Sequence, residues 1–137
     1  MSADRPQPAQ PLRIAVVGAG SSGLLLTLLL QRQGHHVQLF ERSPQLRSEG
    51  CGILLVRSGV EAIAAAGIPG LLDDLLAGGR PVEQFVIRNL RGDLIETSPA
   101  ERQPDELPSL LIRRQVILEA LWRHADPRSF RGGAELE

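Results

Sequence analysis

The sequence predicts an α/β fold that opens with a β-α-β unit. Three observations carry this prediction: an apolar run at 14–17, a glycine-rich turn at 18–23, and a second apolar run that ends at Glu41. A short continuous apolar run is typical of a parallel strand that is covered on both faces. We therefore expect strand, turn, helix and strand to follow one another between Leu12 and Glu41.

The turn Gly18-Ala19-Gly20-Ser21-Ser22-Gly23 has the glycine spacing of a dinucleotide-binding site. Gly18 permits the tight turn, Gly20 lets a pyrophosphate approach the backbone, and Gly23 lets the helix lie close to the strand. We expect the helix to begin near Ser21 or Ser22. Its unpaired N–H groups and the positive end of its dipole would then face a diphosphate.

The predicted helix carries an almost wholly apolar stretch at 24–30, which favours burial, and Gly34 is placed as its left-handed C-terminal residue. Thr27 stands where this fingerprint usually has Ala or Gly, so we expect helix and sheet to lie slightly further apart. The second strand ends at Glu41, 18 positions after Gly23. A carboxylate there can accept hydrogen bonds from the hydroxyls of an adenosine ribose, and it disfavours a 2′-phosphate.

Several further elements are expected after Glu41. They are an apolar strand at 53–55, a helix that Ser58 caps and that ends at Ala66, a helical piece at 71–77, an antiparallel hairpin at 81–98 with strands 82–89 and 94–97, an exposed connection at 98–108, a helix from Arg114 to His124, and the beginning of a strand at 130–137.

Length and composition fit one small domain, or part of a larger one, with low net charge. The chain has 137 residues and a formal net charge of −1, so we expect no general attraction to nucleic acid or to a membrane surface. Cys51 is the only cysteine, which excludes an intrachain disulfide and fits a reducing cytoplasm. Residues 1–11 are polar and proline-rich, which predicts a disordered tail and not a signal peptide. The apolar run at 24–30 is far shorter than the ~20 residues that span a bilayer.

The sequence contains no Ser-His-Asp, Cys-His or His-Glu-x-x-His arrangement, so we expect no catalytic residue in this chain. His35 and His36 lie between a helix and a strand without a second set of ligands nearby, and we interpret them as a solvated junction. We therefore expect no metal site. The expected partners are small molecules, and the sequence leaves the oligomeric state open.

These motifs together resemble those of the class A flavoprotein monooxygenases, the para-hydroxybenzoate hydroxylase group. The similar segments are the glycine turn, Glu41-Arg42, Arg47 ahead of 50–53, and 112–117 leading to Ala120-Leu121. The resemblance implies FAD as the cofactor. It also implies that the glycine turn holds the FAD diphosphate and that Glu41 holds the adenosine ribose.

The resemblance further implies that an arginine at the start of a later helix reaches the flavin side of the cofactor. We place it at Arg114, because Ile117 and Leu121 then fall at apolar positions, and Arg113 is the alternative. Arg47 matches the family's basic residue on the loop after the second strand. The candidate cofactor-binding residues are therefore Gly18, Ala19, Gly20, Ser21, Ser22, Gly23, Glu41, Arg42, Arg47 and Arg114.

Two further fingerprints of the family are missing from this chain. It has no Asp-Gly pair, and its only Gly-Asp pair, Gly92-Asp93, lies in the turn of the predicted hairpin. We therefore expect an N-terminal fragment that stops about where the third parallel strand should form. On this interpretation, 12–137 is an incomplete Rossmann-like FAD-binding domain, and the hairpin at 81–98 lies toward the substrate side.

By resemblance, the full-length enzyme would use NAD(P)H and O₂ to hydroxylate an aromatic or other apolar small molecule, and the fragment alone would be inactive. Two alternatives stay open. One is the nucleotide-binding domain of an NAD-dependent dehydrogenase or reductase, although the hairpin and the Arg114 helix argue against it, since another strand-helix unit would be expected. The other is a nucleotide-binding module without catalytic activity.

Overall fold

The structure, a computed structural model, describes residues 10–45, 50–100 and 105–135. They form two compact units. The first comprises the described residues up to Gly50 together with those from Arg114 onward, and the second is Cys51–Arg113. Apart from its last two residues, the predicted tail lies outside the described residues, as does Arg47.

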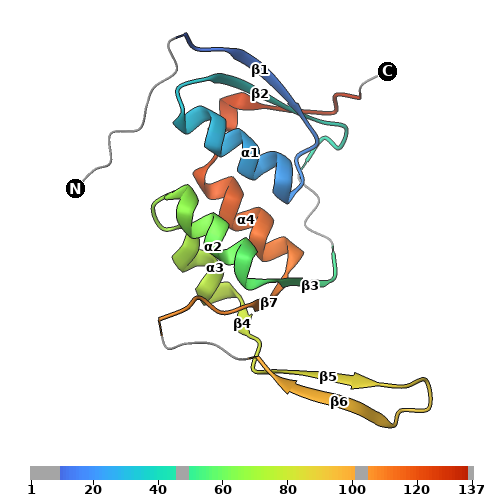
Figure 1. The fold of residues 1–137 in the computed structure, drawn as a ribbon. Coiled ribbons are helices and arrows are strands. Elements are labelled where there is room, and N and C mark those ends of the chain that lie inside the picture. Colours follow the sequence, from blue (N-terminus) through green and yellow to red (C-terminus); the bar gives the residue numbers. More distant parts are fainter. Residues whose placement is uncertain (1–9, 46–49, 101–104, 136–137) are drawn as a thin grey trace. The chain divides into compact units, whose positions relative to one another are not determined.

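The first unit contains a parallel sheet of three strands (Figure 1). The strands are β1 (Arg13–Val17), β2 (His36–Glu41) and β8 (Phe130–Gly132), in the order β1-β2-β8. Helix α1 (Ser21–Arg32) connects β1 to β2, so the predicted β-α-β unit is confirmed. Gly34, with φ 89°, reverses the chain after the helix, as expected of a left-handed C-terminal glycine.

The core of this unit lies between one face of the sheet and two helices. Helix α4 (Arg114–His124) packs against α1, and the 3₁₀ turn η1 (Pro127–Ser129) leads from α4 into β8. Trp122 on α4 meets Phe130 on β8 edge to face, with ring centroids 5.1 Å apart. The other core side chains are buried and almost all apolar: Val16, Leu24, Thr27, Leu28, Val37, Leu39, Ile117, Leu118, Ala120 and Leu121.

Strand β8 confirms the strand that was expected to begin at 130, and it corrects another expectation from the sequence. The parallel sheet was expected to lack its third strand, but residues 130–132 pair with β2 in parallel, Leu39 opposite Phe130 and Glu41 opposite Gly132. The strand has only 3 residues, too few to show a hydrophobic period of its own. Its pairing therefore depends on a partner strand that is distant in sequence.

The second unit has a small antiparallel sheet, two helices and a hairpin. The sheet contains β3 (Gly52–Leu55), β7 (Leu110–Arg113) and β4 (Arg80–Pro81), in the order β3-β7-β4. The helices are α2 (Arg57–Ala66) and α3 (Leu71–Gly78), which pack together; their buried residues include Val60, Ile63, Leu71 and Leu75. β7 was not expected. Its four residues directly follow the predicted connection, and the strands with which they pair lie far away in sequence, so no local pattern indicates a strand there.

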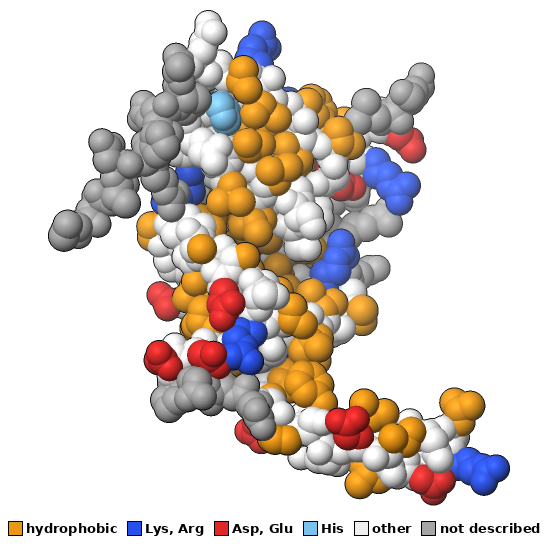
Figure 2. Space-filling model, in the orientation of Figure 1, with side chains coloured by type: hydrophobic (Ala, Val, Ile, Leu, Met, Phe, Trp, Pro, Cys, Tyr) orange, Lys and Arg blue, Asp and Glu red, His pale blue; other side chains and the backbone are white. Residues whose placement is uncertain are grey.

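The predicted hairpin is confirmed as β5 (Gln84–Arg88) and β6 (Leu94–Pro99), which pair in antiparallel register. Apolar side chains lie on its surface, as Figure 2 shows by their orange colour. Phe85, Val86, Ile87, Leu94 and Ile95 are all more than 40% exposed. The hairpin is thus covered on neither face by the described residues.

The predicted cap of α2 is wrong. The helix begins at Arg57 after Val56, and no side chain of its own terminus caps it, so Ser58 lies inside the first turn. The main-chain N–H of Arg57 instead donates to the hydroxyl oxygen of Ser109, at 2.9 Å. An ion pair between Arg57 and Glu106 joins the same two segments. A side chain far along the chain therefore supplies the cap that a local residue was expected to supply.

Candidate cofactor site

The three glycines of the turn after β1 each meet a different steric requirement. Gly18 has φ 94°, a conformation that other residues rarely adopt. A Cβ on Gly20 would meet no atom within 4 Å, so space lies beside the backbone where the helix begins. A Cβ on Gly23 would lie 3.1 Å from the carbonyl carbon of Gly18 and would overlap its oxygen. Of these three glycines, only Gly23 is therefore required because neighbouring atoms leave no room for a Cβ.

Helix α1 presents its amino terminus at this turn. Gly20 is the N-cap residue with extended backbone, no side chain caps the terminus, and the first turn contains no acidic residue. Ser21 and Ser22 are the first two helical residues, so the predicted start of the helix is confirmed. Uncapped N–H groups and a positive dipole end next to open space make a place that suits a phosphate.

Glu41 ends β2 beside the turn. Its Oε2 accepts a hydrogen bond from the main-chain N–H of Ala19 at 2.9 Å, and its Oε1 accepts one from the main-chain N–H of Ser43 at 2.9 Å. The N–H of Gly18 also donates to the carbonyl oxygen of Phe40, at 2.7 Å. The end of β2 and the glycine turn are therefore held together by both main chain and side chain.

The bond between Glu41 and Ala19 could not be read from the sequence. The glycine fingerprint assigns the acid to a ligand and says nothing about the backbone of the turn. Ser43 was likewise not among the candidate residues, although it is buried and its N–H binds the carboxylate. No local pattern signals either contact.

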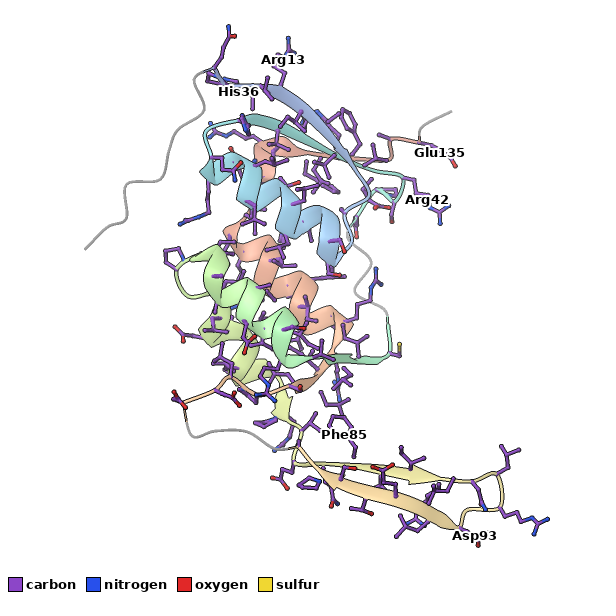
Figure 3. All side chains as sticks on the ribbon, in the orientation of Figure 1. Arg13, His36, Arg42, Phe85, Asp93 and Glu135 are labelled. Carbon is purple, nitrogen blue, oxygen red and sulfur yellow. The ribbon has the colours of Figure 1, made fainter. Side chains whose placement is uncertain are left out.

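The candidate arginines lie in different places. Arg42 follows Glu41 directly, is exposed, and extends outward at the end of β2 (Figure 3). Arg114 is the first residue of α4, as predicted, and its Cβ and Cδ would each lie 3.2 Å from a Cβ on Gly50. Gly50 therefore fits directly against the Arg114 side chain. The alternative, Arg113, is the exposed last residue of β7.

A separate cavity of about 790 Å³ opens on the first unit. Arg13, His36 and Gln38 line it, together with Asp126 and Arg128, whereas no residue of the glycine turn does. Hydrogen bonds from Arg128 hold the pKa of the Asp126 carboxyl below its usual value. This cavity lacks the uncapped helix terminus that suits a phosphate, so the glycine turn is the better candidate for a nucleotide.

The described residues place no three His, Cys, Asp or Glu side chains where they could hold a metal ion. His35 accepts a hydrogen bond through its Nδ1 from the main-chain N–H of Leu12, at 3.2 Å. Within the same described part of the chain, no helix is both long enough and apolar enough to cross a membrane.

Comparison with known proteins places the glycine turn and Glu41 inside a shared domain. Residues 16–50 match the family described as NAD(P)-binding Rossmann-like domain. Kynurenine 3-monooxygenase of Salinispora tropica is 38% identical over 110 residues, which cover 77% of this chain and 24% of that protein. 3-Amino-4-hydroxybenzoate 2-monooxygenase of Streptomyces cremeus is 44% identical over 114 residues, which cover 80% of this chain and 28% of that protein.

The fold is also similar to that of solved structures. CtdE, solved in complex with FAD and a substrate, superposes with a TM-score of 0.75 over 92% of this chain and 31% of that one. Its identity is 20%, so this likeness concerns the fold alone. The chain spans about a quarter of the length of the curated relatives that it matches.

Proposed function

We propose that this chain, which is a relative of the FAD-dependent monooxygenases, binds the adenosine and diphosphate part of FAD at the turn between β1 and α1. The relatives confirm the resemblance that the sequence predicts. The observation that carries the proposal is the uncapped start of α1 at Gly20, with open space beside it and the Glu41 carboxylate next to it.

The diphosphate is the group that this backbone suits best. An FAD diphosphate brings two negative charges, and the first N–H groups of α1 can donate to its oxygens. Because Gly20 has no Cβ and the first turn of α1 has no acid, neither bulk nor like charge from the helix itself opposes this approach. Ser21 and Ser22 would contribute main-chain N–H groups after Gly20. Ala19, whose N–H is bonded to Glu41, would lie beside the ligand and link the turn to the ribose side.

Glu41 would bind the adenosine ribose. A carboxylate can accept about four hydrogen bonds, so its bonds to Ala19 and Ser43 are compatible with ribose hydroxyls as further donors. The two main-chain bonds also orient the carboxylate before any ligand arrives. Preorganisation of this kind favours affinity, because the ligand does not have to order the side chain.

Arginines would serve the rest of the cofactor. Arg42, Arg47 and Arg114 are the candidates, and the resemblance implies that Arg114 reaches the flavin side. A guanidinium group offers planar paired donors to phosphate oxygens. Arg114 is the first residue of α4, and its side chain packs against Gly50, so the base of the side chain has a fixed position from which such a contact could be made.

In the whole protein, bound FAD would supply the redox chemistry for an NAD(P)H- and O₂-dependent hydroxylation of an aromatic or other apolar small molecule. The relatives' names, kynurenine 3-monooxygenase and 3-amino-4-hydroxybenzoate 2-monooxygenase, support an aromatic substrate. The residues of this chain would bind and orient the cofactor, and none of them is assigned as an acid or base. The lone Cys51 and the low net charge support a cytoplasmic protein with small-molecule partners.

Calorimetric titration of the 137-residue chain with FAD tests the proposal. Replacing Gly20 with Val puts a branched side chain into the open space, so FAD affinity should fall at least tenfold while thermal stability stays close to that of the unaltered chain. Ala65→Val, on the exposed face of α2, is the matched control and should leave affinity unchanged. Equal FAD affinity in the Gly20 and Ala65 variants would refute the assigned site.

A nicotinamide dinucleotide is the second candidate ligand, because residues 16–50 match an NAD(P)-binding family. The same titration with NAD⁺ and NADP⁺ separates the two. We expect FAD to bind more tightly than either. Tighter binding of NAD⁺ than of FAD would favour a dehydrogenase or reductase domain over a flavin-binding one.

A further inference from the structure

The last described residues of the first unit close around the end of β2. The N–H of Ala134 donates to the main-chain oxygen of Glu41 at 3.0 Å, and the N–H of Gly133 donates to the main-chain oxygen of Ser43 at 3.1 Å. Gly132 stands opposite Glu41 in the parallel ladder. The segment 132–134 therefore fixes the main chain from which the Glu41 carboxylate projects.

Gly132 lies too close to its neighbours to carry a side chain. A Cβ at this position would lie 2.9 Å from the carbonyl carbon of Pro44, would overlap the carbonyl oxygen, and would lie 3.0 Å from Cε1 of Phe130. Since the Pro44 group is main chain, it could move only together with the residues bonded to it. One of these is Ser43, whose N–H holds Oε1 of Glu41 at 2.9 Å.

We infer that Gly132 is a positioning residue for ribose recognition, acting through Pro44 and Ser43 on the Glu41 carboxylate. The inference rests on the proposed function, because it presumes that Glu41 meets a ribose. It adds a residue 91 positions away from Glu41 that the glycine fingerprint does not include.

The effect should be larger on the ribose than on the diphosphate. Hydrogen bonds weaken steeply with poor angles and longer distances, so a shift of the carboxylate would lose its bonds to the ribose hydroxyls. The diphosphate site is built from the turn at 18–23 and the start of α1. The atoms nearest to a Cβ on Gly132 belong to Pro44 and Phe130, so the clash would reach this turn only through Glu41 and its bond to Ala19. A Cβ at Gly132 should therefore reduce discrimination between ribose and deoxyribose more than it reduces binding of the diphosphate.

The test measures the dissociation constants of ADP, 2′-deoxy-ADP and 3′-deoxy-ADP for the 137-residue chain. The unaltered chain should bind ADP about tenfold or more tightly than it binds whichever of the two deoxy analogues has the lower affinity, as expected for loss of a hydrogen bond to a charged acceptor. In Gly132→Ala this preference should fall to about twofold or less. Arg131→Ala changes the exposed neighbouring residue of β8 and should keep the full preference.

Several results would overturn the inference. Equal weakening of ADP and both deoxy analogues in Gly132→Ala would show a structural role only, and an unchanged preference would show no role. If far-UV circular dichroism shows Gly132→Ala unfolded, Ala134→Pro removes the N–H to Glu41 without a clash at Pro44 and should show the same reduced preference. A preference that Ala134→Pro leaves intact overturns the inference. Absence of ADP binding by the unaltered chain would overturn the proposed function and this inference together.

Discussion

At the scale of single residues, Glu41 combines two tasks: its carboxylate holds the glycine turn through Ala19, and in the proposed function it binds the ribose. Replacement of Glu41 with Ala should weaken FAD binding by about 1–3 kcal/mol, as expected for lost hydrogen bonds to a charged acceptor. Isothermal calorimetry measures this directly. FMN, which lacks the adenosine half, should lose much less affinity.

The matched control is Glu61→Ala, which removes an exposed acid from α2 and should leave FAD affinity unchanged. An equal loss for FAD and FMN in Glu41→Ala would contradict a role in ribose recognition. It would point to the turn as a whole, since both ligands would need the diphosphate side of the site.

Thr27 is a polar residue in an otherwise apolar part of the core. It is fully buried in α1, and in the described part of the chain its Oγ1 has no hydrogen-bond partner. A buried hydroxyl without a partner costs ~1–3 kcal/mol. Thr27→Val, which keeps the shape of the side chain, should therefore raise the midpoint of thermal unfolding by several degrees.

Calorimetric melting of the variant checks this expectation. Thr97→Val makes the same chemical change on the exposed hairpin and should leave the melting temperature nearly unchanged. Equal effects at both positions would mean that the gain comes from valine itself and not from removal of the buried hydroxyl.

At the scale of elements, the amino terminus of α2 depends on a hydroxyl from far along the chain. Ser109→Ala removes the acceptor of the Arg57 N–H, and loss of a cap costs ~0.5–2 kcal/mol. Urea unfolding should show this loss as a lower midpoint with the same slope. Ser58→Ala, at the position that local sequence rules favour as the cap, should change the midpoint by much less.

Two substitutions in the glycine turn should separate an effect on folding stability from an effect on FAD affinity. Gly23→Ala forces α1 away from the Gly18 carbonyl and should cost ~1–3 kcal/mol of folding stability, as overpacking does. Gly20→Val should instead reduce FAD affinity with little effect on stability. Urea unfolding and FAD titration of both variants check this contrast, and a large stability loss in Gly20→Val would contradict the open space beside it.

The elements that the sequence predicts well are those whose signal is local. The glycine spacing, the apolar run after it and the acid at Glu41 predict β1, α1 and β2, and all three are confirmed. β7 was not predicted, and for β8 only the start of a strand at 130 was predicted and not its partner, because these strands have 4 and 3 residues and pair with distant strands. For the same reason, the contacts of Ser43 and Gly132 around Glu41 were missed.

At the scale of the whole molecule, we expect binding without turnover. No residue of this chain is assigned as a catalytic acid or base, and the chain spans about a quarter of the length of its curated relatives. With FAD added, the 137-residue chain should therefore show no NAD(P)H-dependent oxygen consumption above that of free FAD. An oxygen electrode measures this, and consumption that Gly20→Val abolishes would refute the expectation.

The pairing of β2 with β8 also has a consequence for how the protein is made. Gln38 bonds to Ser129, 91 positions away, so the sheet cannot be completed until that stretch has been synthesised. Translation at ~5–20 residues per second makes this delay roughly 5 to 20 s. During that time the growing chain has the glycine turn but lacks the segment that steadies Glu41. We expect the nucleotide site to mature only after residue 134 has emerged, so cofactor capture follows synthesis of β8 and does not guide the folding of the residues before it.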